Sequence, residues 1–249
     1  SMDIYNLGIF RMEKKKDKPS ILICMPCYDS VKINTMLSVF KLAKELSKSG
    51  IEVGINTMKS PLIHQARNYL TATFLKSAYS HLLFIDSDVE FNPEAVVKMM
   101  VAEKDIICTP YRTKSLNPDV HNYTVEFKDP KKVSILVGGI VEIEAGPTGI
   151  MLIARRVFEK LMKNHPELKI QNRAAGAGKF QGDELTDAHQ FYYNFFEFKF
   201  ENGLSMGEDI SFCRLARKNK IKIYANIDSE TAHHGGFVWR GSFKDRLNG

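Results

Sequence analysis

Short apolar runs alternate with longer amphipathic segments through the first half of the chain, and this alternation most constrains the fold. The apolar runs that predict buried strands lie at residues 21–25, 51–56, 81–85 and 105–108. Between them, residues 31–49, 60–78 and 92–102 have the spacing and end signals of helices. Strands that alternate with helices of this length form βαβ units around a parallel sheet. We therefore expect an α/β fold in which helices flank a mostly parallel central sheet.

The second half of the chain has a different pattern. Gly138-Gly139 separates two apolar runs at 133–137 and 140–144, which is typical of a β-hairpin. Further strands are expected at 149–153, 191–200, 221–225 and 229–232, and helices at 155–164 and 208–218. Within 191–200, Phe196, Phe198 and Phe200 alternate with charged residues, as in a half-buried strand. This half is expected to form a smaller, mixed or antiparallel part of the same fold.

The domain organisation is expected to be simple. Residues 11–18 are a charge run, so we expect residues 1–18 to form a flexible charged tail and residues 19–249 to form one domain. Ser1-Met2 looks like a remnant of expression cloning. Residues 171–190 are rich in glycine and lack a regular pattern, which fits either a substrate lid or a plain surface loop.

Composition excludes several classes of protein. With 44% hydrophobic residues the chain is not intrinsically disordered. It has no run of about 18 apolar residues that would predict a transmembrane helix, and no secretory signal pattern. Four cysteines in 249 residues do not form a disulfide scaffold. We therefore expect a cytoplasmic protein. The net charge of +6 is a weak indication of anionic partners.

The strongest local motif is Asp86-Ser87-Asp88, which directly follows the apolar run 81–85. In open α/β sheets, ligands bind at the carboxyl ends of the strands. Two carboxylates at such an end suit a hard divalent cation, because such cations prefer oxygen ligands and bridge phosphates. Alternatively, Asp88 is a turn residue and Asp86 is a buried carboxylate whose hydrogen bonds are satisfied within the fold.

Three further groups are candidates for chemistry, each with a structural alternative. Glu208 and Asp209 open an amphipathic helix, where acids either stabilise the positive end of the helix or supply a general base. His233 and His234 precede Gly235-Gly236, and histidine is either a metal ligand or a structural residue there. Arg67 is either a surface residue or a contact to a diphosphate.

Taken in order and spacing, these motifs resemble those of the GT-A-type glycosyltransferases, a class of metal-dependent nucleotide-sugar transferases with a Rossmann-like sheet. The resemblance extends over about residues 20–236. It rests on Cys24-Met-Pro-Cys-Tyr28-Asp29, Ala66-Arg67-Asn68, Asp86-Ser87-Asp88, Gly146-Pro-Thr-Gly149, Glu208-Asp209-Ile and Thr231-Ala-His233-His234-Gly235.

The resemblance implies a role for each motif. It implies a donor-binding pocket made by Pro26, Cys27, Tyr28, Asp29, Ser87 and Arg67, with Asn56 or Thr57 nearby after the second strand. It implies that Asp86 faces the ribose or the metal, and that Asp88 binds Mn²⁺ or Mg²⁺ on the donor diphosphate. His233, or its neighbour His234, corresponds to the C-terminal metal ligand. Gly149 would border the pocket for the acceptor and the donor sugar.

The reaction implied is transfer of a sugar from a nucleotide-diphosphate sugar, with a UDP-sugar favoured, to a hydroxyl of a glycan or another acceptor, DNA included. Asp209 matches the base of inverting members of the class. If the enzyme retains configuration, Asp209 or Glu208 only orients a sugar.

Two other functions stay open at this point. A nucleotidyltransferase that makes nucleotide sugars would need a glycine-rich loop after the first strand, and residues 24–34 contain no glycine. A non-catalytic basic module for nucleic acid or a membrane surface would need clustered lysine and arginine, which are spread along this chain. The sequence leaves the donor, the acceptor and the oligomeric state open.

Overall fold

The computed structural model describes residues 19–117, 121–170 and 189–247 of the chain. Its central sheet contains β1 (Ile21–Cys27), β2 (Val53–Lys59), β3 (His81–Ile85), β5 (Ile106–Cys108), β6 (Ile135–Leu136), β7 (Ile140–Ile143), β8 (Ile150–Ala154) and β11 (Ile223–Asn226). Their order across the sheet is β2-β1-β3-β8-β5-β11-β7-β6. The strands β8 and β7 run opposite to the other six. The predicted mostly parallel sheet of an α/β fold is therefore confirmed.

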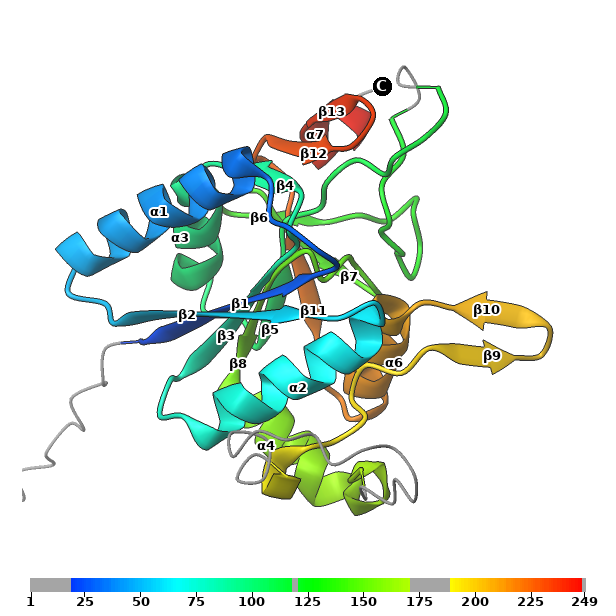
Figure 1. The fold of residues 1–249 in the computed structure, drawn as a ribbon. Helices are drawn as coiled ribbons and strands as arrows, with labels where there is room; N and C mark the ends of the chain where they lie inside the picture. The colour runs from blue at the N-terminus through cyan, green and yellow to red at the C-terminus, as the bar shows by residue number, and fades with distance from the viewer. Residues whose placement is uncertain (1–18, 118–120, 171–188, 248–249) are drawn as a thin grey trace, which may run out of the picture.

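Helices cover both faces of this sheet (Figure 1). One face carries α1 (Ile33–Lys48) and α3 (Pro93–Val101), and the other carries α2 (Ile63–Lys76), α4 (Arg155–Asn164) and α6 (Glu208–Lys218). The sheet is thus the middle layer of three, as expected for strands that alternate with helices.

Each central strand contributes to two cores, because successive side chains of a strand point to opposite faces of the sheet. Along β1, Ile23 and Met25 are buried in the core beneath α1 and α3. Leu22 and Cys24 are buried in the core on the side of α2, α4 and α6. Burial on both faces holds the ends of these strands in place, and those ends carry the candidate site.

Two small antiparallel sheets lie outside the central one. The first joins β4 (Val89–Phe91), β12 (Thr231–His234) and β13 (Val238–Gly241), and the second joins β9 (Lys199–Glu201) and β10 (Leu204–Met206). The remaining described elements are the short helices η1 (Pro166–Leu168), η2 (His189–Phe191) and α7 (Phe243–Leu247). Because β12 pairs with β4, it brings the two histidines of the chain's C-terminal part next to the loop after β3.

Most predicted elements are confirmed in type and order. The helices predicted at 155–164 and 208–218 coincide with α4 and α6. The predicted hairpin at Gly138-Gly139 joins β6 to β7, with φ angles of 82° and 71° at the two glycines. Such positive φ angles favour glycine. The short elements β4, β13 and α7 had no prediction.

The prediction that Asn56 and Thr57 follow the second strand is wrong. The parallel ladder between β1 and β2 continues residue by residue to Cys27 and Lys59, and pairs Asn56 with Cys24 and Thr57 with Met25. Both residues therefore lie inside β2 and point to opposite faces of the sheet. The residue that β2 places at its carboxyl end is Lys59.

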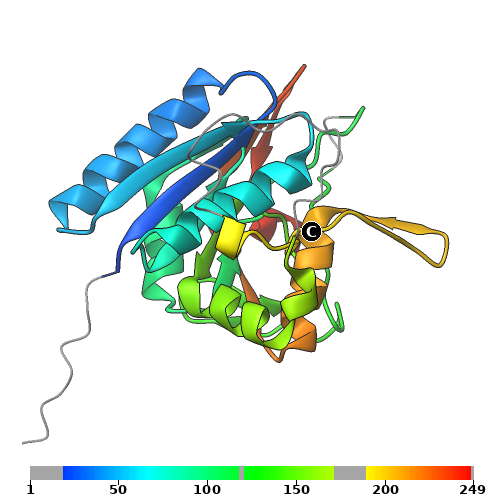
Figure 2. The same cartoon turned by 60° about the horizontal axis from the view of Figure 1, so that its bottom comes forward.

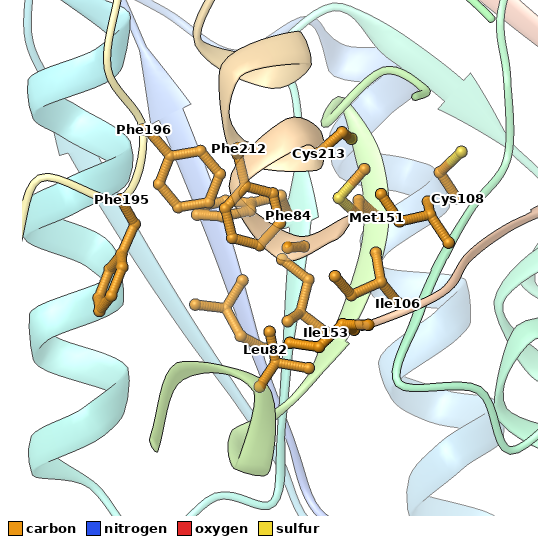
Figure 3. Close-up of a cluster of buried hydrophobic side chains, with 14 of the residues drawn as sticks. Leu82, Phe84, Ile106, Cys108, Met151, Ile153, Phe195, Phe196, Phe212 and Cys213 are labelled. Carbon is orange, nitrogen blue, oxygen red and sulfur yellow. The ribbon is translucent and has the colours of Figure 1, made fainter. Parts of the chain in front are cut away.

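The prediction of one half-buried strand at 191–200 is also wrong. Phe196 is fully buried, but Phe198 is 58% exposed, and β9 begins only at Lys199. The Asn68 side chain explains the difference, because its amide accepts a hydrogen bond from the Phe196 N–H (2.9 Å) and donates one to the Phe196 carbonyl (3.2 Å). The Asn68 amide thus forms the two backbone hydrogen bonds at Phe196 that a neighbouring strand would otherwise form. Phe196 packs against Phe84 (5.3 Å between ring centroids) and Phe212 (4.5 Å), as Figure 3 shows.

The hairpin of β9 and β10 projects from the body of the protein just before α6 (Figures 1 and 2). Asn202 and Gly203 form its two-residue turn, with φ angles of 53° and 77°. Asn-Gly is a strong signal for such a turn. The turn is thus signalled locally by Asn202-Gly203 in the sequence.

The predicted tail at 1–18 lies outside the described residues, and so does the candidate lid at 171–190 up to residue 188. Within the described ranges, no helix combines the length and the apolar character that crossing a lipid bilayer requires.

The aromatic cluster around Phe196 gives the first prediction. Phe196→Ala should destabilise the protein by about 3–5 kcal/mol, because it removes a fully buried ring that packs against two others. Phe198→Ala, its matched control, should change the free energy of unfolding by less than about 0.5 kcal/mol, since Phe198 is exposed. Urea denaturation followed by circular dichroism measures both. Equal losses in the two variants would contradict the described burial.

Candidate active site

The candidate site lies at the edge of the central sheet where the parallel strands end. The loops after β1, β3 and β5 leave from this edge, and the reversed strand β8 begins there, beside Gly149. The start of α6 joins this edge through the side chain of Arg67. Residues from distant parts of the sequence therefore meet at one place.

Arg67 is the centre of the cluster. It projects from α2 and is only 2% exposed. Its Nη2 donates to Asp86 Oδ1 at 2.7 Å, and its Nε donates to Glu208 Oε1 at 3.0 Å. Burial disfavours the charge of Arg67, but Asp86 and Glu208 outweigh burial and raise its pKa above the ordinary value. Arg67 is thus a buried counter-ion to two acids. The interpretation as a surface residue is wrong, and contact with a diphosphate stays a prediction.

Asp86 is held on both carboxylate oxygens. Oδ1 accepts from Arg67, and Oδ2 accepts from the Tyr111 hydroxyl at 3.1 Å. The Asp86 N–H donates to the Gly149 carbonyl at 2.9 Å. A Cβ at Gly149 would lie 2.2 Å from the Tyr111 hydroxyl and 2.5 Å from Asp86 Oδ2. Glycine at 149 therefore leaves the room that the Asp86–Tyr111 pair occupies.

Asp88 lies between a histidine and a lysine. Its Oδ1 is 3.4 Å from His233 Nε2, and its Oδ2 accepts from Lys114 Nζ. Burial raises the pKa of Asp88, but the contacts with His233 and Lys114 outweigh burial and lower the pKa to about 2. Asp88 is therefore ionised at neutral pH.

The orientation of His233 is fixed by its other ring nitrogen. Nδ1 lies 2.8 Å from the Arg112 carbonyl oxygen, which can only accept, so Nδ1 carries a proton. In neutral His233 the lone pair of Nε2 then faces the Asp88 carboxylate. A proton or a cation between Nε2 and the carboxylate makes this arrangement favourable.

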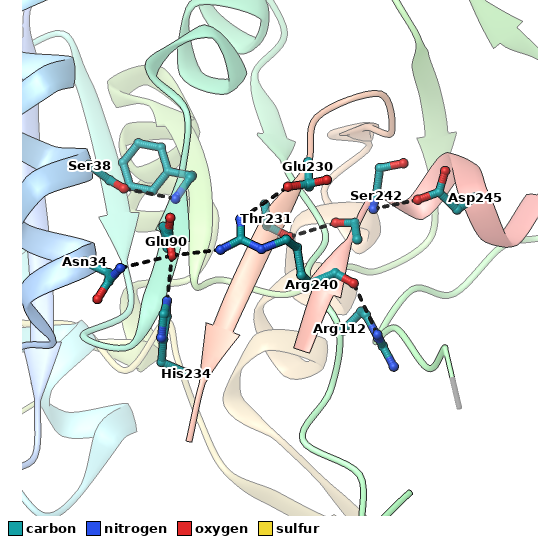
Figure 4. A network of polar contacts seen from close by, with 12 residues as sticks. Asn34, Ser38, Glu90, Arg112, Glu230, Thr231, His234, Arg240, Ser242 and Asp245 are labelled. Carbon is teal, nitrogen blue, oxygen red and sulfur yellow. Dashed lines mark hydrogen bonds and ion pairs between the residues drawn. The ribbon is translucent and has the colours of Figure 1, made fainter. Parts of the chain in front are cut away.

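His234 has a separate partner, because neighbouring side chains of a strand point to opposite sides. Its Nε2 is 2.8 Å from Glu90 Oε2, which also accepts from Arg240 (3.2 Å) and Asn34 (3.4 Å), as Figure 4 shows. Of the two adjacent histidines, His233 lies with Asp88, and His234 belongs to the Glu90 network.

Asp88 and His233 are the residues that could hold a divalent cation at this site. In the described part of the chain, no three or more His, Cys, Asp or Glu side chains form a group that could hold a metal ion. Asp88 and His233 offer one carboxylate and one imidazole. Ions such as Mg²⁺ commonly take one or two protein ligands and complete their coordination with water and substrate phosphates. The pair could therefore supply two ligands of such an ion, and the rest of its coordination would come from elsewhere.

Asp209 lies at the start of α6, after Glu208. Its Oδ1 accepts from the Ile210 N–H at 2.8 Å. Burial, with a further contribution from the charge of Glu208, raises the pKa of Asp209 to about 6. A carboxylate with a pKa near neutral is suited to accept a proton during a reaction.

The residues predicted for the nucleoside pocket lie at the ends of β1 and β3. Pro26 is buried, Cys27 is half-buried, and Tyr28 is 74% exposed. Asp29 Oδ1 accepts from Lys59 Nζ at 2.7 Å, which joins the ends of β1 and β2. The Ser87 carbonyl accepts from the Lys32 N–H at 2.8 Å. Their predicted role in binding a nucleoside stays a prediction.

The sequence analysis missed Tyr111, Arg112 and Lys114, which contact the two aspartates and His233. All three follow β5, a strand that the apolar run at 105–108 predicts. The rule that ligands bind at the carboxyl ends of strands pointed to this segment too. It was applied only to the strand that ends in acids.

Comparison with known proteins adds similarities of fold. No protein-family model and no curated protein matches the chain. Similar solved structures include A197 from STIV (21% identity, TM-score 0.49, covering 87% of this chain and 86% of that one). They also include GalNAc-T7 with UDP, GalNAc and Mn²⁺, at 11% identity and a TM-score of 0.47, covering 86% of this chain and 43% of that one. Mannose-1-phosphate geranyltransferase from Thermus thermophilus is similar at 12% identity and a TM-score of 0.45, covering 86% of this chain and 75% of that one. All these TM-scores are below 0.5, so the fold assignment rests on the topology of this chain.

The central role of Arg67 is testable by stability. Arg67→Met should destabilise the protein by about 3–5 kcal/mol, because it leaves two partly buried carboxylates without their counter-charge. Arg156→Met is the matched control. Arg156 pairs with Asp105 on the surface, and its loss should cost less than about 1 kcal/mol. Chemical denaturation at pH 7 compares the two. A loss at Arg67 no larger than at Arg156 would show that Arg67 does not hold the site together.

Proposed function

We propose that this chain is a glycosyltransferase formed by a single GT-A-like domain at residues 19–249. It transfers a sugar from a nucleotide-diphosphate sugar to an acceptor hydroxyl, with a divalent metal ion and with inversion of configuration. The observation that carries this proposal is the pairing of Asp88 with the oriented Nε2 of His233, in the same cluster as a carboxylate, Asp209, whose pKa is raised.

Asp88 and His233 would hold Mn²⁺ or Mg²⁺ against the donor diphosphate. Asp86 is the further candidate ligand, although Arg67 and Tyr111 occupy its oxygens in this structure. When bound, the cation acts as a Lewis acid that stabilises negative charge on the departing nucleoside diphosphate. Arg67 holds Asp86 in place beside this pair, so the arrangement exists before a substrate binds.

Asp209 is the proposed general base. Its carboxylate accepts the proton of the acceptor hydroxyl while the hydroxyl oxygen attacks the anomeric carbon. The bond from the anomeric carbon to the diphosphate oxygen breaks, and its electron pair leaves with the nucleoside diphosphate. Glu208 is ion-paired with Arg67, which gives it a supporting place rather than the role of base.

The donor would lie along the strand ends. Pro26, Cys27, Tyr28, Asp29 and Ser87 are proposed to bind the nucleoside, and Gly149 to border the donor sugar. We favour a UDP-sugar as donor and a glycan or another hydroxyl compound as acceptor, DNA included. Asn56 and Thr57 are less suited to the pocket, since they lie inside β2.

The first test is binding and turnover. A panel of nucleotide sugars, with and without Mn²⁺, should raise the unfolding temperature only for the true donor and only with metal. Turnover should release a nucleoside diphosphate. Release of pyrophosphate from a nucleoside triphosphate and a sugar phosphate would instead establish a nucleotidyltransferase, and DNA binding without turnover would establish a binding module.

The two histidines provide a sharp test of the metal site. Asp88→Ala and His233→Ala should each weaken Mn²⁺ binding in the presence of nucleotide by more than about tenfold, since even indirect partners of a metal matter to that extent. His234→Gln should keep the affinity of the wild type, because His234 pairs with Glu90. Mn²⁺ binding is measured by electron paramagnetic resonance. Loss at His234 and none at His233 would reverse the assignment.

The pH profile tests Asp209. Only ionised Asp209 can accept a proton, and its pKa is about 6, so kcat/KM should fall by about tenfold per pH unit below this value and level off above it. Asp209→Asn should bind the donor normally, lose about 100- to 10,000-fold in rate, and lack this acid inflection. An unchanged inflection in Asp209→Asn would remove Asp209 as the base.

A further inference from the structure

Lys114 is the charged residue beside the candidate metal pair that the proposed mechanism does not use. Its ammonium contacts Asp88 Oδ2, whereas His233 Nε2 lies near the other carboxylate oxygen, Oδ1. Asp88 Oδ1 and His233 Nε2 therefore remain available to a cation while Lys114 stays in place. Lys114 thus contacts neither Asp88 Oδ1 nor His233 Nε2, and it adds a positive charge to the same site.

The stem of Lys114 is placed by a glycine. A Cβ at Gly235 would lie 3.3 Å from both Cδ and Cε of Lys114, and 2.9 Å from the ring of Trp239. The aliphatic stem thus runs across the backbone of Gly235, directly after the two histidines. The absence of a side chain at position 235 leaves space for this stem, whose ammonium lies beside Asp88.

The site carries more negative than positive charge, so a further ammonium group would favour the binding of an anion there. Asp86, Asp88, Glu208 and Asp209 are four acids, and Arg67 is shared by two of them. A donor diphosphate adds two more negative charges next to Asp88. A single divalent cation leaves this region acidic, so a further cation favours binding of the diphosphate. Lysine is a common phosphate ligand that acts as a point charge.

Lys114 is free enough to take a new partner. Its side chain is 39% exposed, so a ligand can reach the ammonium. Asp88 also has His233 as a partner, and Lys114 can contact a phosphate oxygen while it still contacts Asp88. A buried lysine fixed on Asp88 would not have this freedom.

We propose that Lys114 binds the diphosphate of the donor, beside the cation that Asp88 and His233 would hold. This rests on the proposed function. As the bond between the anomeric carbon and the diphosphate oxygen breaks, the electron pair passes to that oxygen, and Lys114 shares the resulting negative charge. The acceptor oxygen forms the new bond, and its proton passes to Asp209.

The test compares Lys114→Met, Lys114→Arg and the wild type by calorimetry with Mn²⁺. The probes are UDP, GDP, CDP and dTDP, each with its nucleoside. Lys114→Met should weaken the diphosphate that binds best by about tenfold, because a charged contact is lost, and leave the nucleoside unchanged. Lys114→Arg should retain most of the affinity. Lys98→Met, which removes a lysine paired with Glu94 on α3, is the matched control and should bind like the wild type.

A second measurement separates binding from positioning. Mn²⁺ affinity without nucleotide should not fall in Lys114→Met, because removal of a neighbouring positive charge does not oppose a cation. If it falls as much as diphosphate affinity does, Lys114 only orients Asp88, and the proposal is overturned. Unchanged diphosphate affinity overturns it as well, while the glycosyltransferase proposal stands. If the wild type binds none of the diphosphates, both proposals fail.

Discussion

The candidate site depends on one buried ionic contact, that of Arg67 with Asp86 and Glu208. It joins α2 and the end of β3, which are consecutive elements, to the start of α6, which lies far away in the sequence. A guanidinium buried to this degree is stable only with carboxylates close by, and carboxylates at the edge of an apolar core need a cation in turn. The three residues therefore fix each other. Their geometry determines where Asp88 and Asp209, the neighbours of Asp86 and Glu208, are placed.

Much of this fold could be predicted from sequence, because its signals are local. Apolar runs and helical spacing define β1, β3, α4 and α6 without reference to the rest of the chain. The predicted secondary structure is wrong where contacts with residues distant in the sequence determine the local conformation. Periodicity predicted a strand through Phe196 and Phe198, but the amide of Asn68, more than a hundred residues earlier, binds the backbone at Phe196 and ends the pattern. Similarly, the length of β2 is set by its pairing with β1.

The residues of the candidate site could be predicted from the sequence, but the contacts between their side chains could not. The sequence indicated Asp86, Asp88, Asp209 and the two histidines as candidates from residue type and position. It could not distinguish His233 from His234, because their partners come from β4 and the loop before it, about 145 residues away. Strand alternation gives the answer once β12 is paired with β4: adjacent histidines must face opposite sides, and only one of them can lie beside Asp88.

Asp88 and Asp209 have opposite electrostatic surroundings, which shift their pKa values in opposite directions. Asp88 is next to Lys114 and His233, and its pKa falls to about 2, whereas Asp209 is buried beside Glu208, and its pKa rises to about 6. A carboxylate that stays ionised is suited to hold a cation, and one that titrates near neutrality is suited to exchange a proton. Sites that run acid–base chemistry commonly separate the pKa values of chemically identical groups in this way. The difference arises from the surroundings, namely burial and the neighbouring charges, since both side chains are aspartates at the same edge of one sheet. Arg67 lowers the pKa of Asp209, but burial and the charge of Glu208 outweigh this effect, so the pKa still rises to about 6.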